Sequence, residues 1–185
     1  MTVYEKAAPE NTMPTLRTAL EKATELSTDI LLSTTTGASA LKALEVARET
    51  GFSGKIIAVT HVWGMREPGK NTLSAEDRKT LEDGGVVVVT AGHALSGVER
   101  AISGEFGGAY PTEIIAHALR MLSQGVKVCV EIGAMAMDAG QAEYDRPIIA
   151  IGGTGLGLDT ACVITPSYSA KIFETRVHEI LCKPY

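Results

Sequence analysis

The chain has 185 residues, of which 45% are hydrophobic and 21% are charged, as in an ordinary folded protein. This length suffices for one domain with a sizeable core and is short for two. The formal net charge of -5, with no basic stripe of interleaved aromatic residues, argues against nucleic acid or an anionic membrane as the partner.

The N-terminal stretch MTVYEKAAPENTMP lacks a basic start followed by an apolar run, so we expect no secretory signal. No apolar run approaches the roughly 20 residues that a membrane-spanning helix needs. The cysteines Cys129, Cys162 and Cys182 lie far apart and fit neither a disulfide framework nor a metal site. We therefore predict a cytoplasmic protein.

Helical and strand-like patterns alternate in the first part of the chain. Apolar residues recur at helical spacing in some segments, and short apolar runs predict buried strands in others. The predicted elements are, in order, an arm over residues 1–11, a helix over 13–27, a strand over 30–32, a helix from Ala40 to about Thr50, a strand over 55–60, a long loop over 61–73, a short helix from Ser74 and a strand over 86–90.

The second part of the chain is richer in glycine. Its predicted elements are a short helix within residues 91–108, a helix over 112–123, a fourth strand over 126–132, a turn or helix start over 133–140, a fifth strand over 147–151, a glycine-rich turn over 152–157, a last strand over 161–164 and a final helix over about 169–181. This alternation of helices with Val/Ile-rich strands is typical of a mostly parallel sheet that is covered on both faces. We predict a single three-layer α/β domain.

The hydroxyl-rich turn over residues 33–39 is the first candidate binding element. A strand, a small-residue turn and a helix in this order leave backbone N–H groups at the helix start without partners, where the helix dipole is positive. Such a turn can hold a phosphate. Alternatively, it only caps the next helix, with Ser39 as the N-cap. It contains no lysine and no G-x-x-x-x-G-K-[ST] pattern, which disfavours a nucleoside triphosphate with magnesium.

The glycine-rich turn over residues 152–157 superficially matches a dinucleotide fingerprint. A strand rather than a long helix is predicted after it, so the context of a dinucleotide-binding turn is missing. A turn that lets the backbone approach a ligand is the interpretation we favour.

Three polar side chains are expected near the carboxyl ends of strands, the rim where open α/β sheets bind ligands. His61 and His93 could hydrogen-bond a ligand or move protons, or they could hold backbone carbonyls in loops. Glu131 ends the predicted fourth strand and would face the turn over residues 33–39 if that strand neighbours the first. Alternatively, its carboxylate interacts with N–H groups at a helix start.

The segment after the third strand offers further candidates. Arg100 could reach a phosphate or carboxylate, or pair on the surface with Glu99 or Glu105. Ser96 and His93 could form a nucleophile and its general base. The sequence around them has no recognisable nucleophile-elbow motif and no acid that would orient the histidine. Met135 belongs to a residue type that more often fills a core than lines a flavin pocket.

Three runs of the sequence, ILLSTTTGASALKAL, KIIAVT and AIGGTGLGLDTACVI, resemble the C-terminal α/β domain of pyruvate kinase. In that domain a T-x-[ST]-G-x-[ST] turn holds a phosphate of the allosteric sugar bisphosphate. The residues of this chain that fall on the pattern are Thr34, Thr35, Thr36, Gly37 and Ser39. Ala38 stands where the kinases often carry a larger residue, and Asp159 replaces the asparagine of their closing glycine-rich turn.

The catalytic barrel of pyruvate kinase has no counterpart in this chain, so we do not expect a pyruvate kinase. The segments over residues 90–108 and 127–140 resemble standalone prokaryotic proteins built from that domain alone. This resemblance implies FMN as the bound cofactor and leaves the activity open.

We therefore expect a phosphorylated small molecule, FMN first among the candidates, at the C-terminal edge of the sheet with its phosphate on the Thr34–Ser39 turn. The chain is then a binding module that senses a metabolite, or an enzyme for flavin redox chemistry or phosphosugar turnover. A homo-oligomer is left open. The residues expected around the ligand are Ser33, Thr34, Thr35, Thr36, Gly37, Ala38, Ser39, Thr60, His61, Gly64, His93, Ser96, Arg100, Glu131 and Met135.

Overall fold

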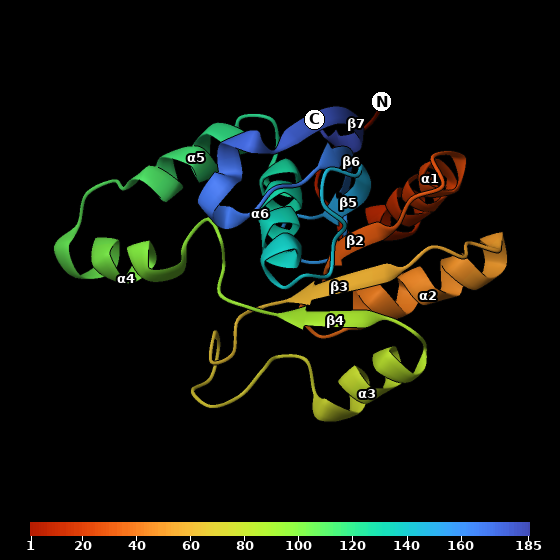
Figure 1. The fold of residues 1–185 in the computed structure, drawn as a ribbon, viewed down its shortest axis with the longest axis horizontal. Helices are drawn as coiled ribbons and strands as arrows, with labels where there is room; N and C mark the ends of the chain where they lie inside the picture. The colour runs from red at the N-terminus through yellow and green to blue at the C-terminus, as the bar shows by residue number, and fades with distance from the viewer.

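Seven strands form one mixed sheet with helices on both of its faces (Figure 1). The computed structural model describes residues 1–185. The strands are β1 (Thr2–Tyr4), β2 (Ile30–Ser33), β3 (Ile56–Thr60), β4 (Val87–Thr90), β5 (Ile148–Gly152), β6 (Thr160–Thr165) and β7 (Arg176–Pro184). Their order across the sheet is β1-β7-β6-β5-β2-β3-β4.

Strand directions confirm the prediction of a mostly parallel sheet. The strands β5, β2, β3 and β4 run parallel to one another. Strand β6 is antiparallel to both β5 and β7, and β1 is parallel to β7. Only β6 therefore runs against the others, and the carboxyl ends of the four central strands share one edge.

The helices are α1 (Thr12–Glu25), α2 (Ala38–Thr50), α3 (Ala75–Asp83), α4 (Gly97–Phe106), α5 (Pro111–Arg120) and α6 (Gln124–Asp138), with 3-10 helices at Pro9–Asn11 and Ser169–Glu174. Because side chains alternate along a strand, β2 contributes to two apolar clusters. Ile30 and Leu32 join the cluster with Leu16 of α1, whereas Leu31 joins the cluster with Val126 of α6. The sheet thus lies between α1 and α2 on one face and α6 on the other.

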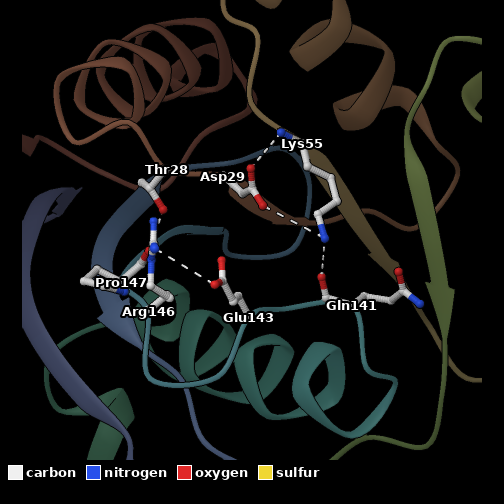
Figure 2. A network of polar contacts seen from close by, with 7 residues as sticks. All are labelled: Thr28, Asp29, Lys55, Gln141, Glu143, Arg146 and Pro147. Carbon is white, nitrogen blue, oxygen red and sulfur yellow. Dashed lines mark hydrogen bonds and ion pairs between the residues drawn. The ribbon is translucent and has the colours of Figure 1, made fainter.

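A polar network fastens the amino ends of the central strands, opposite the edge described above (Figure 2). Asp29 accepts a hydrogen bond from the backbone N–H of Lys55 at 2.8 Å, which ties the start of β2 to that of β3. The Lys55 ammonium donates to the carbonyl of Gln141 at 2.7 Å, and the Thr28 hydroxyl donates to that of Pro147 at 2.5 Å. These contacts hold the sheet and the end of α6 together.

The prediction of a fourth strand over residues 126–132 is wrong, because this segment is the middle of α6. The segment over residues 133–140, predicted as a turn or a helix start, is mostly the second half of this helix. The Ser123 side chain accepts a hydrogen bond from the N–H of Val126 at 3.0 Å and so caps the helix start. Almost every residue of α6 is buried, so its sequence lacks the polar stripe of a surface helix and resembles a buried strand.

Two predictions about the chain ends are wrong as well. The expected arm over residues 1–11 contains β1, which pairs with β7 at the sheet edge. The expected final helix over residues 169–181 is a short 3-10 helix followed by β7. Pairing with distant strands decides both structures, and short-range periodicity does not contain that information. None of the helices is both long enough and apolar enough to cross a lipid bilayer.

Candidate functional site

A cavity of about 1050 Å³ lies beyond the carboxyl ends of β2, β3 and β5. Its walls come from the turn between β2 and α2, the loop after β3, the glycine-rich turn after β5, and the helices α4, α5 and α6. All the predicted ligand-contacting residues except Gly37 and Gly64 line it. Residues from distant parts of the chain therefore meet around one space.

Gly37 and Gly64 belong to the turn before α2 and to the loop after β3, but they lie outside the cavity lining. Gly37 has a φ of +93°, and a Cβ atom there would approach Leu73 Cδ1 at 2.8 Å, so glycine suits both the conformation and the close approach. Gly64 donates its N–H to the carbonyl of Lys70 at 2.9 Å, within the loop after β3. Neither residue lines the cavity.

The turn over residues 33–39 leaves backbone donors free. Thr34 is buried, and its hydroxyl accepts a hydrogen bond from the N–H of Gly37 at 3.1 Å. Gly37, rather than Ser39, occupies the N-cap position of α2, so the interpretation of Ser39 as the cap is wrong. The backbone N–H groups that line the cavity wall without an acceptor in the protein are those of Thr35, Thr36, Ala38 and Ser39.

Lys127 and Glu131 form an ion pair one turn apart on α6, where their side chains are 8% and 7% exposed. The second carboxylate oxygen of Glu131 accepts the N–H of Leu95 at 3.1 Å, so the loop after β4 is fastened to α6. Both charged residues line the cavity. Glu131 therefore reaches the predicted place from a helix, not from the end of a strand.

His61 and His93 lie side by side, with ring centroids 5.5 Å apart in an edge-on arrangement. His93 Nε2 accepts the N–H of Val62 at 3.4 Å, which leaves the proton of the neutral ring on Nδ1. Burial lowers the pKa of both rings. The neighbouring His93 and Arg66 lower the pKa of His61 further. Glu131 raises the pKa of His93, but burial together with Lys127 and Arg100 outweighs this effect. Both imidazoles are therefore neutral at neutral pH and suited to exchange protons.

Three arginines of the cavity wall, Arg66, Arg100 and Arg120, form no ion pair with a carboxylate. Arg120 donates only to the amide oxygen of Gln124, at 2.7 Å. The surface pair considered for Arg100 forms with neither Glu99 nor Glu105, and Glu99 instead accepts the N–H of Thr112 at 2.8 Å. Lys127 is neutralised by Glu131, and Glu113 is the other carboxylate of the wall, so the three arginines leave the wall with an excess of positive charge in a chain of net charge -5.

Sequence reasoning missed several residues of the wall. Lys127 precedes Glu131 by four residues, a spacing that forms ion pairs on helices, but the segment was predicted as a strand. Arg66 lies in the loop that was expected to be functional, yet nothing in its local sequence indicated the direction of its side chain. Gly153, Gly155 and Gly157 line the cavity, and the interpretation of their turn as a segment that approaches a ligand stays a prediction.

The fold and site define an α/β protein with one large polar cavity at the carboxyl edge of its central strands. A comparison with protein-family models finds no family that matches the chain. The structure contains no group of three or more His, Cys, Asp or Glu side chains placed to hold a metal ion.

Proposed function

We propose that this protein binds a phosphorylated small molecule in the cavity, with the phosphate on the Thr34–Ser39 turn. The observation that carries the proposal is the set of free backbone N–H groups in this turn, at the start of the thirteen-residue helix α2. Such donors and the positive end of the helix dipole favour an anion. The hydroxyls of Thr35, Thr36 and Ser39 add donors that bind no other protein group.

The charge of the wall supports an anionic ligand. An arginine without a carboxylate partner is available for charge-assisted hydrogen bonds with a phosphate or a carboxylate. Three such arginines gather around this cavity although acidic residues outnumber basic ones in the chain, 22 to 17. The local field therefore attracts the kind of ligand that the overall charge would repel.

FMN is the ligand that we propose first, in keeping with the resemblance described above. It joins one phosphate to a large ring system, and the cavity is at the upper end of the usual size for small-molecule sites, roughly 300–1,000 Å³. Apolar side chains that could contact the ring, Leu95, Ile132 and Met135, lie in the same wall as the polar groups. A sugar phosphate is the alternative ligand and would fill less of the space.

A catalytic role of the same cavity is a second candidate, favoured by the neutral pair His61 and His93. Neutral imidazoles beside a buried carboxylate are suited to general acid–base steps. Flavin redox chemistry and phosphosugar turnover both fit this description. Oxidation of NAD(P)H by flavin-loaded protein, and conversion of sugar phosphates by ligand-free protein, distinguish the two.

The phosphate site is tested by calorimetric titration with FMN, riboflavin and fructose 1,6-bisphosphate. We expect FMN to bind at least about tenfold more tightly than riboflavin, which lacks the phosphate, because a charge-assisted hydrogen bond contributes about 1.5–3 kcal/mol. The double variant Thr36→Ala/Ser39→Ala should weaken binding of the phosphorylated ligand by a similar factor.

Ser74→Ala is the matched control, because Ser74 caps α3 through a bond to the N–H of Asp77 and does not line the cavity. It should lower stability by about 1 kcal/mol and leave affinity unchanged. Equal affinity for FMN and riboflavin, or full affinity in the double variant, contradicts the assignment of the turn.

A further inference from the structure

Helix α4 forms one wall of the cavity without being packed into the core. Arg100, Ser103 and Gly104 of this helix line the cavity. No residue of α4 is buried, and its apolar side chains Val98 and Phe106 are 77% and 78% exposed. A helix of ten residues depends on packing for its stability in water. Helix α4 therefore lacks the apolar packing that fixes α6, the helix of another cavity wall.

The chain is fixed to the rest of the protein shortly before and shortly after α4. Leu95 is buried, and its N–H donates to Glu131 at 3.1 Å. Beyond α4, Ala116 of α5 is buried. Figure 1 shows α4 standing away from the sheet, with a long connection from β4 on one side and a loop to α5 on the other. Helix α4 thus lies between two points at which the chain is anchored.

Glycines with positive φ stand at both ends of α4. Gly97, its first residue, has a φ of +44°, and Gly107, its C-cap, has a φ of +69°. A Cβ atom at either position would meet no atom within 4 Å, so close packing is not the reason for glycine there. Hinges are formed by a few residues at the ends of elements that absorb a change of φ and ψ, which glycine does at little cost. The chain can therefore turn at both ends of α4.

Two side chains hold α4 to the start of α5. The Glu99 carboxylate accepts hydrogen bonds from the N–H of Thr112, at 2.8 Å, and from its hydroxyl. Tyr110, the N-cap residue of α5, makes no side-chain capping bond, so Glu99 takes that place at the positive end of the helix dipole. The Ser103 hydroxyl donates to Glu113 at 2.8 Å. We call these contacts of Glu99 and Ser103 the latch.

We infer that α4 is a lid on the cavity, which opens when the latch breaks and closes over a bound anion. Arg100 lines the cavity from this helix and forms no ion pair with a carboxylate. An anionic ligand gives its guanidinium the partner that no side chain supplies, and so favours the closed position of α4. Closure over an anion rests on the proposed function, whereas the latch is a property of the protein without ligand.

Hydrogen–deuterium exchange followed by mass spectrometry tests the latch on the full chain without ligand. We expect the amides of α4 to exchange at least about 100-fold faster than those of α6, because α4 detached from α5 is too short to stay helical. Glu99→Ala should accelerate the exchange of α4 by a further factor of about three or more, since the bonds to Thr112 are lost.

Glu105→Ala is the matched control for the latch. It removes the same charge from the same helix, but Glu105 is exposed and does not line the cavity. The exchange of α4 should be no faster in this variant than in the wild type.

Closure over an anion is tested by repeating the exchange with FMN and with fructose 1,6-bisphosphate, each at a saturating concentration taken from the calorimetric titration. Bound ligand should slow the exchange of α4 at least about tenfold. Arg100→Gln keeps the latch and removes the charge, so saturated Arg100→Gln protein should show little of this protection.

The outcomes separate the lid from the ligand site. Exchange of α4 that is as slow as that of α6 without ligand overturns the inference, and so does a Glu99→Ala variant that exchanges no faster than Glu105→Ala. A ligand that binds in the titration but leaves the exchange of α4 unchanged overturns the lid and not the site. If neither ligand binds, the proposed function fails together with closure over an anion, and the latch stands or falls on the exchange without ligand.

Discussion

The buried pair of Lys127 and Glu131 is the most sensitive residue-level feature of the cavity. Each partner has lost most of its water, and the energetic cost of that loss is offset only while the other charge is present. The N–H of Leu95 adds a further bond to the carboxylate. The pair therefore connects the stability of α6 to the shape of the cavity wall.

Lys127→Met should lower the free energy of unfolding by about 3–5 kcal/mol, because the Glu131 carboxylate stays buried without its partner. The double variant Lys127→Met/Glu131→Leu should recover most of this loss, since no unpaired charge is left inside. Urea unfolding followed by circular dichroism measures both effects.

Lys79→Met serves as the control, because Lys79 pairs with Asp83 in solvent on α3. Lys79→Met should lower the free energy of unfolding by less than about 1 kcal/mol. A Lys127→Met variant that is no less stable than Lys79→Met would show that the buried pair does not act as described.

At the residue level, the sequence was sufficient to place the turn over residues 33–39 and the two histidines at the same edge of the sheet, because each lies within three residues of the end of a recognisable strand. It could not select Lys127, whose secondary structure was predicted wrongly. The availability of Arg66 and Arg120 depends on which carboxylates lie near them in space. No local pattern carries that information.

At the level of elements, α6 shows how burial on all sides obscures the period of a helix. Its run VKVCVEI has the β-branched composition of a parallel strand, and an apolar residue suits nearly every position. Close packing against β6 fixes the helix in place. Gly125 is at the contact, where a Cβ atom would lie 2.1 Å from Thr160 Oγ1 and 2.3 Å from Thr160 Cβ.

Gly125→Ala should therefore lower the free energy of unfolding by roughly 1–3 kcal/mol, because the helix or the strand must shift to make room. Gly104→Ala is the contrasting variant within α4, where an added Cβ meets no atom within 4 Å. It should be neutral or stabilising by up to about 1 kcal/mol, owing to the higher helix propensity of alanine. Thermal unfolding of both variants gives the comparison, and equal effects would contradict the packing described for α6.

At the scale of the whole molecule, β1 pairs with β7 at one edge of the sheet, so segments near the two ends of the described chain lie side by side. Thr2 lies opposite Cys182 and Tyr4 opposite Pro184. The Tyr4 hydroxyl also contacts that of Thr15 on α1 at 3.0 Å, and burial raises the pKa of Tyr4 to about 12, so the phenol stays protonated at neutral pH. The N-terminal strand thus covers an edge that would otherwise be free.

Deletion of residues 1–6 should lower the thermal midpoint and promote aggregation, because the nine-residue strand β7 becomes an open edge. Thermal unfolding followed by circular dichroism measures the midpoint, and static light scattering during heating measures the aggregation. Tyr4→Phe keeps the strand and removes only one hydroxyl contact, so it should cost about 1 kcal/mol without aggregation. A truncated chain that is as stable and as monodisperse as Tyr4→Phe would show that β1 does not protect the edge.

The sequence by itself determined the α/β class, the central parallel strands β2, β3 and β5, and the hydroxyl-rich turn at the start of α2. Each of these is specified by a continuous segment whose apolar pattern or turn chemistry is local. Only the tertiary structure decided the helical state of α6, the pairing of β1 with β7 and the cationic wall of the cavity. Those features arise from contacts between segments far apart in the chain, where burial and partner choice outweigh local preference.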